Sequence, residues 1–240
     1  MSQSAVRTVR IAHAYGNRRD KIERAVAADV DLIEADLWFR AGDFWLRHER
    51  RLSFFPLLYD RRPRRGIRDD GPWALTVFPR HYIRPDLQPL PLSELLERAD
   101  GKRRLLLDLK DEDVEASEAR VIAEALVRAL AAAGREDAIV CGQTDLLDDV
   151  REAGPHLDVR YSIERQEQWD ALLRRLDAGA AIRGLCVYHR FFDDGVARFT
   201  ADNGLQVYAW TVDDPERARQ LVQMGAAGIT SNSLPLLEAL

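Results

Sequence analysis

Apolar and polar positions follow one repeating pattern along most of the chain. A short apolar run, typical of a buried strand, is followed by a segment whose apolar residues recur at the three- and four-residue spacing of an amphipathic helix. The predicted strands span residues 6–13, 31–39, 104–110, 138–142, 159–163, 184–188, 206–212 and 228–231. The predicted helices span residues 18–28, 91–98, 115–133, 145–153, 167–178, 193–203, 215–224 and 234–240. Eight strands in alternation with eight helices predict a parallel sheet closed into a (β/α)8 barrel, the TIM barrel of the α/β class.

Residues 50–90 break this alternation. They follow a short strand predicted at 44–46 and are rich in aromatic residues, proline and arginine, which is typical of an insertion or a long loop. We therefore expect a single domain over residues 1–240 with an insertion after its second strand. The aromatic residues fit either a lid or lipid-facing surface or a small buried cluster. The arginines at 61–65 fit either peripheral contact with anionic lipid or phosphate or an ordinary solvated loop.

Composition restricts the class of protein and its surroundings. With 46% hydrophobic and 31% charged residues the chain is typical of soluble globular proteins, and its net charge of −5 argues against nucleic acid as the main partner. No apolar run approaches the roughly 18 residues of a membrane span, and the N-terminus lacks the apolar core of a secretory signal. Cys141 and Cys186 lie in apolar runs, so we expect buried free thiols and a reducing, cytoplasmic location. Nothing in the sequence indicates an oligomeric state.

Two carboxylates in the second predicted strand are the first candidates for chemistry. Glu34 and Asp36 are two residues apart in an apolar run, so both side chains leave the same face of the strand. Two such charges about 4 Å apart repel by about 4 kcal/mol at a typical effective protein dielectric, so a cation or a shared proton must relieve them. The alternative is a pair of solvated carboxylates on an edge strand.

Further polar residues lie at the C-terminal ends of predicted strands, where barrels of this type carry their active sites. They are His13, Glu34, Asp36, Asp108, Lys110, Gln143, His189, Trp210 and Asn232, with His48 in the loop after the second strand. Asp108 and Lys110 repeat the two-residue spacing, which brings a third carboxylate and an ammonium to the same place. Three carboxylates form a hard oxygen site that favours one divalent cation, Mg²⁺ or Ca²⁺, over Zn²⁺. An ordinary salt bridge between Asp108 and Lys110 is the alternative.

His13 and His48 are candidates for a general acid and a general base, because imidazole titrates near neutral pH. Singly, either histidine would more often be structural; together with three carboxylates they favour catalysis. Two rival interpretations stay open. In the first, the chain is an aldolase-like barrel in which Lys110 forms a Schiff base with a carbonyl substrate, although beside Asp108 the amine should stay protonated. The chain also fits a barrel that binds phosphate or phospholipid without catalysis.

The motifs that carry these residues resemble the glycerophosphodiester phosphodiesterase family, in the family's order and over nearly the whole chain. They are Ala12-His13 with Gly16-Asn17, Ile33-Glu34-Ala35-Asp36, His48-Glu49, the segment 91–96, Leu107-Asp108-Leu109-Lys110, the segment 209–213 and the segment 225–232. The resemblance implies a (β/α)8 barrel with a divalent metal that cleaves phosphodiesters of phospholipid headgroups. It assigns the metal to Glu34, Asp36 and Asp108. The remaining roles are acid–base catalysis for His13 and His48, phosphate contact for Lys110, a wall of the headgroup pocket for Trp210, and substrate binding for Asn17 and Asn232.

Two departures from the family's pattern qualify this assignment. The family usually has Arg-Gly directly after the first histidine, where this chain has Ala14-Tyr15, and its third metal ligand is usually Glu, where this chain has Asp108. Both features are similar to the venom-type sphingomyelinase D branch, which forms a cyclic phosphate and a free headgroup alcohol. The chain lacks that branch's cysteine-closed loop. We therefore expect a metal-dependent phosphodiesterase acting on a small-molecule or lipid diester, with a phospholipase D-like activity as the alternative.

Overall fold

The computed structural model describes residues 7–48, 50–51, 58–61, 75–78, 81–84, 88–99, 101, 103–110, 114–143 and 145–240. Between residues 50 and 84 it describes the backbone of four short strands, and from residue 88 onwards it again describes side chains.

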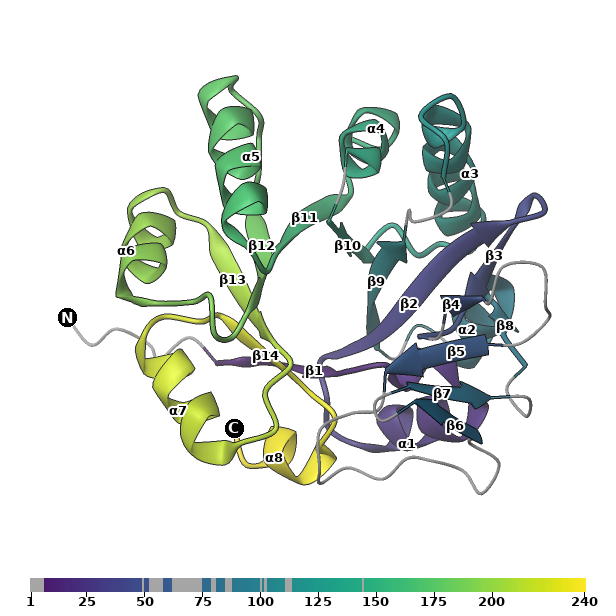
Figure 1. Ribbon diagram of the computed structural model, residues 1–240, viewed down its shortest axis with the longest axis horizontal. Coiled ribbons are helices and arrows are strands. Elements are labelled where there is room, and N and C mark those ends of the chain that lie inside the picture. The colour runs from purple at the N-terminus through teal and green to yellow at the C-terminus, as the bar shows by residue number, and fades with distance from the viewer. Residues whose placement is uncertain are drawn as a thin grey trace.

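The barrel predicted from the sequence is present (Figure 1). Within the described residues, eight parallel strands form its wall: β1 (Val9–Ala12), β2 (Leu32–Arg40), β9 (Arg104–Lys110), β10 (Ile139–Gly142), β11 (Asp158–Ile163), β12 (Gly184–Tyr188), β13 (Gln206–Trp210) and β14 (Gly228–Ser231). In space they follow the order β1-β14-β13-β12-β11-β10-β9-β2. The ring closes because β2 also pairs with β1, with Ile11 opposite Leu32.

Helices lie around the outside of this ring (Figure 1). They are α1 (Arg19–Ala27), α2 (Leu92–Ala99), α3 (Ala119–Ala132), α4 (Leu146–Ala153), α5 (Gln166–Asp177), α6 (Asp194–Asp202), α7 (Pro215–Gln223) and α8 (Leu234–Glu238), with a 3-10 turn η1 (Tyr15–Asn17) after β1. Asp193, Asp214 and Ser233 begin the last three helices, each accepting a hydrogen bond from the backbone N–H three residues ahead. Among the helices of the described residues, none combines the length and apolar composition that a membrane-spanning helix requires.

One helix starts later than its sequence pattern predicts. The pattern places the start of α3 at residue 115, but the helix begins at Ala119. A separate turn occupies the four preceding residues, closed by the hydrogen bond of 2.8 Å from Glu118 N to Glu115 O. The prediction was therefore wrong by about one helical turn at this end of the helix.

The alternation of side chains along each strand places the functional groups. Ile33 on β2 and Leu107 on β9 belong to the large core between strands and helices. Leu32 and Leu106, which have the opposite parity, belong to a small apolar cluster inside the barrel. Residues that follow at two-residue steps therefore also face the interior, nearer the C-terminal ends of the strands. The interior thus changes from apolar to acidic along β2 and β9.

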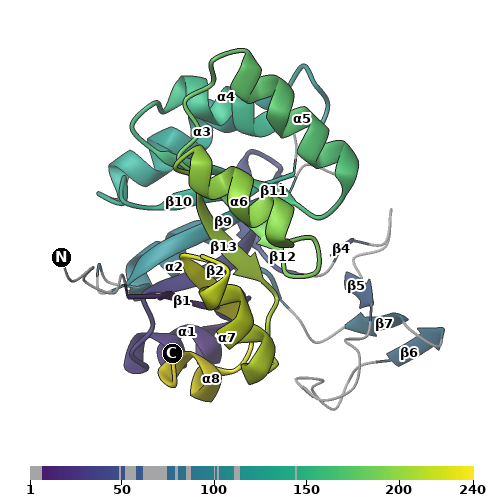
Figure 2. The same cartoon turned by 90° about the vertical axis from the view of Figure 1, so that its left-hand side faces the viewer.

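A hairpin and a small sheet interrupt the barrel after β2. The turn at Ala41 and Gly42, with φ of 51° and 82°, joins β2 to the antiparallel strand β3 (Asp43–Leu46), which pairs with β8 (Leu90–Pro91). Four further strands form a separate antiparallel sheet beside the barrel (Figure 2): β4 (Arg50–Arg51), β5 (Leu58–Arg61), β6 (Leu75–Phe78) and β7 (His81–Arg84). The insertion predicted after the second strand is thus in place. The side chains invoked for a lid, a lipid-facing surface or a basic cluster lie outside the described residues.

Candidate active site

The C-terminal ends of the barrel strands surround one cavity of about 130 Å³. Its lining contains His13, Glu34, Asp36, His48, Asp108, Lys110, Gln143 and Trp210, all of which the sequence pattern placed at strand ends or in the following loop. It also contains Leu106, Cys141, Ser162, Cys186 and Thr230, which the pattern did not single out. Both cysteines are buried free thiols, as expected. The structure therefore brings these eight candidates together in one place, whereas Asn17, His189 and Asn232 are not part of the lining.

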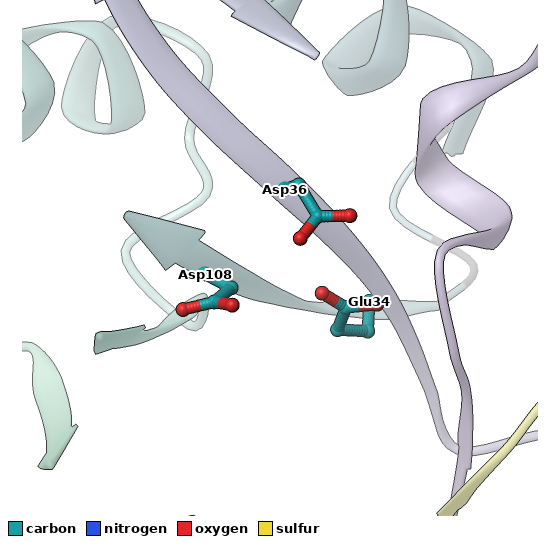
Figure 3. A group of neighbouring side chains, drawn as sticks. All are labelled: Glu34, Asp36 and Asp108. Atoms are coloured by element: carbon teal, nitrogen blue, oxygen red, sulfur yellow. The ribbon is translucent and has the colours of Figure 1, made fainter. Parts of the chain in front are cut away.

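Three carboxylates form the most acidic part of this cavity (Figure 3). Glu34 and Asp36 come from β2, and Asp108 comes from the neighbouring strand β9, where it lies in register with Asp36. One oxygen from each carboxylate lies within 4.8 Å of the others. The side chains of Glu34 and Asp36 are buried. An all-oxygen donor set of this kind fits a hard divalent cation such as Mg²⁺ or Ca²⁺.

Neighbouring groups hold two of these carboxylates in position. The backbone N–H of Ala14, a residue in the left-handed region with φ of 57°, donates to Glu34. Asn17 and Asp36 exchange two hydrogen bonds: Asn17 Nδ2 donates to Asp36 Oδ2 at 2.6 Å, and the backbone N of Asp36 donates to Asn17 Oδ1 at 2.9 Å. Asn17 therefore fixes the position of the Asp36 carboxylate in the structure. Its assignment to substrate binding stays a prediction.

The single ammonium of Lys110 lies among the carboxylates. Its Nζ is 2.7 Å from Asp36 Oδ1 and also donates to Asp108. Burial alone would lower the pKa of Lys110, but Asp108 and Asp36 outweigh it and hold that pKa well above its usual value. Lys110 is therefore charged at neutral pH, which disfavours the Schiff-base interpretation. The salt bridge considered as the alternative for Asp108 and Lys110 exists, within a larger acidic cluster.

The three carboxylates differ in how readily they ionise. Burial raises the pKa of Glu34 well above its usual value, and the charges of Asp36 and Asp108 raise it further. Burial also raises the pKa of Asp108, with the Lys110 ammonium opposing it. The pKa of Asp36 is lowered, because Lys110 and the two histidines outweigh the effect of burial. The cluster thus holds more acidic groups than one ammonium neutralises, and a bound cation would relieve the excess.

The two candidate histidines meet at the edge of this cluster. The ring centroids of His13 and His48 are 6.3 Å apart, and the ring planes are nearly perpendicular at 79°. The Nε2 atom of His13 lies 4.0 Å from Glu34 Oε2. Burial lowers the pKa of His13, although Asp36 opposes the effect. Both imidazoles therefore face the cavity that the carboxylates line.

Asn232 fixes the orientation of His13 from the other side. Its Oδ1 atom lies 2.9 Å from His13 Nδ1, while its Nδ2 atom donates to Asp213 Oδ2 at 3.0 Å. Asp213 also accepts hydrogen bonds from the backbone N of Asn232 and from the Ser231 hydroxyl, both at 2.8 Å. Because a carboxylate only accepts, Asp213 determines which end of the amide faces His13. His13 Nδ1 must then carry the hydrogen, which leaves the lone pair on Nε2, towards the cavity.

Asp213 was not among the candidates drawn from the sequence, although it directly follows the strand predicted at residues 206–212. Its position after β13 was the available signal. His189, a weaker candidate, is not part of the cavity lining; its backbone N donates to Trp210 O at 2.8 Å. Trp210 lines the cavity, and its ring lies 5.3 Å from that of Tyr188.

Comparison with known proteins adds an independent finding. The model of the glycerophosphoryl diester phosphodiesterase family matches residues 81–235, more than half of the chain. The chain belongs to this family. Its membership confirms the resemblance seen in the motifs and the class of enzyme, a phosphoric diester hydrolase. No curated protein sequence matches the chain significantly.

Solved structures of phosphodiesterases share the fold. A protein from Parabacteroides distasonis is 19% identical with a TM-score of 0.70, covering 97% of this chain and 95% of its own. A phosphodiesterase from Oleispira antarctica, solved in complex with the product sn-glycerol-3-phosphate, is 17% identical with a TM-score of 0.68, covering 96% and 95%. One from Thermotoga maritima is 17% identical with a TM-score of 0.65, covering 97% and 96%. At these identities the likeness shows the barrel fold.

The family match covers one part of the candidate site. Asp108, Lys110, Trp210 and Asn232 lie within residues 81–235, whereas both histidines and the two acidic residues of β2 precede them. The roles of individual residues in this glycerophosphoryl diester phosphodiesterase family member therefore rest on the geometry of the cavity.

Proposed function

We propose that this protein hydrolyses glycerophosphodiesters to sn-glycerol 3-phosphate and an alcohol in the cavity at the C-terminal ends of its barrel strands. The observation that carries the proposal is the meeting of Glu34, Asp36 and Asp108 with the rings of His13 and His48 around one cavity. Membership of the phosphodiesterase family supports it, as does the fold shared with the Oleispira antarctica enzyme that was solved with sn-glycerol-3-phosphate.

Glu34, Asp36 and Asp108 would hold one divalent cation, Mg²⁺ or Ca²⁺. Bound there, the cation would act as a Lewis acid that withdraws charge from the phosphate oxygens. Lys110 would contribute a second positive charge to the bound phosphate, because its pKa keeps it protonated at the edge of the cavity. Trp210 would form an apolar wall beside the leaving group.

The two histidines divide the proton transfers between them. His13 accepts the proton of the attacking water at Nε2, since its Nδ1 hydrogen is held by Asn232. His48 donates a proton to the alcohol oxygen as the bond between that oxygen and phosphorus breaks. Water supplies the new oxygen on phosphorus, so the products are a phosphate monoester and an alcohol. Asn17 and Asn232 support these steps by orienting Asp36 and His13.

A second reaction outcome is favoured by one observation. Residue 14 is alanine, whose backbone N–H contacts Glu34, so no guanidinium from this position contacts the phosphate. This feature, like Asp108, is similar to the sphingomyelinase D branch, in which a hydroxyl of the substrate replaces water as the nucleophile. Phosphorus NMR of the products distinguishes the two outcomes, since a cyclic phosphate and a phosphate monoester resonate separately.

Activity screening tests the proposal. The purified protein is incubated with glycerophosphocholine, glycerophosphoethanolamine, lysophosphatidylcholine and a chromogenic diester, each with Mg²⁺, Ca²⁺ or a chelator. We expect turnover of at least one diester that depends on the divalent cation. Binding of phosphate or phospholipid with no turnover under any of these conditions would instead support a non-catalytic barrel.

A further inference from the structure

The backbone just before His48 is held at two points. Strand β3 ends at Leu46, so Arg47 and His48 lie beyond the regular pairing of the hairpin. The backbone N of Arg47 nevertheless donates to the carbonyl oxygen of Asp36 at 3.1 Å. The carbonyl oxygen of Arg47 accepts a buried hydrogen bond of 2.9 Å from the indole nitrogen of Trp38. Residue 47 is thus attached to β2 on both sides of its Cα atom.

The hydrogen bond from Trp38 to the carbonyl oxygen of Arg47 fixes the backbone of His48. The carbonyl group of Arg47 and the backbone N of His48 belong to the same peptide plane, which is rigid. A hydrogen bond that fixes the carbonyl oxygen therefore also fixes where the main chain of His48 starts. The histidine itself is exposed, so this attachment of its backbone matters more than it would for a buried residue.

Trp38 is well suited to hold that plane. It lies on β2 two residues after Asp36, in register with Lys110 on β9 and with Trp45 on β3. The residue is only 5% exposed. The guanidinium carbon of Arg47, itself 6% exposed, lies 4.6 Å from the centroid of the indole ring. A stacked cation and a hydrogen bond to the same residue hold the indole and Arg47 together.

From these contacts we propose that Trp38 is a positioning residue for His48. The indole holds the peptide before the histidine so that its ring faces His13 at 6.3 Å across the edge of the acidic cluster. The proposal rests on the proposed function, in which His48 donates the proton to the leaving alcohol. Trp38 is not part of the cavity lining; it links the strand that carries Glu34 and Asp36 to the histidine.

The substitution Trp38→Phe tests the proposal, because phenylalanine keeps a ring for the stacked guanidinium and removes the N–H that holds the carbonyl oxygen. We expect kcat for a glycerophosphodiester to fall by roughly 10- to 100-fold, since misplacing a catalytic group by about 1 Å can cost about 10²-fold. KM should change by less than about twofold, because ground-state binding is untouched. Affinity for Mg²⁺ in calorimetry should stay that of the wild type. Trp169→Phe, on α5 and outside the cavity lining, is the matched control.

A double-mutant cycle separates positioning from a general structural role. In a His48→Ala background, Trp38→Phe should change kcat by less than about twofold, because there is no imidazole left to misplace. An equal fall in both backgrounds would overturn the proposal, as would wild-type kcat in Trp38→Phe alone. A Trp38→Phe protein that is unfolded or loses Mg²⁺ binding would show that the indole supports the whole barrel, which also overturns it. Wild-type activity in His48→Ala alone would instead refute the acid–base assignment of the proposed function, and this inference with it.

Discussion

The Nδ1 atom of His13 lies 2.9 Å from the Oδ1 atom of Asn232, which joins residues 219 positions apart in the sequence. The contact is made where β14, the last strand of the barrel, pairs with β1, the first. Since Asp213 holds the amide of Asn232, the orientation of His13 depends on two neighbours that approach it only in the closed ring. Closure of the barrel therefore positions the proposed base.

Replacing Asn232 by alanine should lower kcat without unfolding the protein. Without the amide, neither the tautomer nor the ring orientation of His13 is fixed. Losing a hydrogen-bonding partner that orients a functional histidine typically lowers activity by about 10- to 100-fold. Nitrogen-15 NMR of the histidine rings should show the Nδ1–H tautomer in the wild type and a mixture in Asn232→Ala. The control is Asn203→Ala, at the exposed C-terminal end of α6. Equal kcat in Asn232→Ala and the wild type would show that Asn232 does not orient His13 for catalysis.

His13→Ala and His48→Ala should each lower turnover by about 10² to 10⁴-fold, the range expected when a general acid or base is lost. Both variants should keep the melting temperature of the wild type within a few degrees, since neither ring belongs to the apolar core. His156→Ala, an exposed histidine before β11, is the matched control and should retain full activity. Near wild-type turnover in either of the first two variants would mean that its imidazole transfers no proton.

Removing the divalent cation should abolish turnover, and adding back Mg²⁺ or Ca²⁺ should restore it. Asp36→Asn and Asp108→Asn should each weaken Mg²⁺ binding at least about tenfold in calorimetry, because each removes a charged ligand of a hard cation. Asp202→Asn, exposed on α6, should bind Mg²⁺ as the wild type does. Full activity in the chelator-treated protein would rule out a metal-dependent reaction.

Lys110→Met should destabilise the metal-free protein more than the metal-loaded one. In the metal-free protein the ammonium neutralises Asp36 and Asp108, and losing one partner of a buried charge cluster costs up to about 3 kcal/mol. A bound cation supplies positive charge at the same place, so Mg²⁺ should raise the melting temperature of Lys110→Met more than that of the wild type. The same Mg²⁺-induced shift in both proteins would contradict this interpretation of the cluster.

Glu94 provides a pH-dependent test outside the site. Its carboxylate accepts hydrogen bonds of 2.7 Å from Arg19 on α1 and from Arg98 on its own helix, which lower the pKa of Glu94 from 4.5 to about 2. Because the folded-state pKa is the lower one, the stabilisation is present above about pH 4.5 and is lost as the pH falls towards 2. Glu94→Gln should therefore have a lower melting temperature than the wild type at pH 7, and this difference should shrink as the pH falls and disappear near pH 2.

The control for this prediction is Glu97→Gln, a substitution at an exposed position of the same helix. It should change the melting temperature little at either pH. A deficit in Glu94→Gln that stays constant between pH 7 and pH 3 would show that the loss is one of packing rather than of charge.

Much of the barrel could be predicted because its strands are short apolar runs. β9, β12 and β14 have the bounds that the pattern gave, since in each case polar or turn residues flank a run buried on both faces. The same rule of alternation predicted that Glu34, Asp36 and Asp108 would meet, because two-residue spacing on neighbouring parallel strands leaves little freedom. The meeting of these three carboxylates can therefore be predicted from the local sequence of two strands.

The supporting contacts could not be predicted in this way. The link from Asp213 through Asn232 to His13 depends on the closing of β14 on β1, and no local pattern pairs these residues. The contact between Trp38 and Arg47 depends on the register of a hairpin whose turn uses Ala41 in the left-handed region, where non-glycine residues are uncommon. Sequence periodicity predicted which side chains would lie at the ends of the strands. Their orientation depends on contacts between residues that only strand pairing brings together.

The sharpest test of the proposed metal and phosphate site is a crystal structure of the protein grown with Mn²⁺ and sn-glycerol 3-phosphate. We expect an anomalous peak bounded by the carboxylates of Glu34, Asp36 and Asp108, with the phosphate beside it and within hydrogen-bond reach of the rings of His13 and His48. A peak elsewhere on the protein, or imidazoles turned away from a phosphate bound in the cavity, would contradict it.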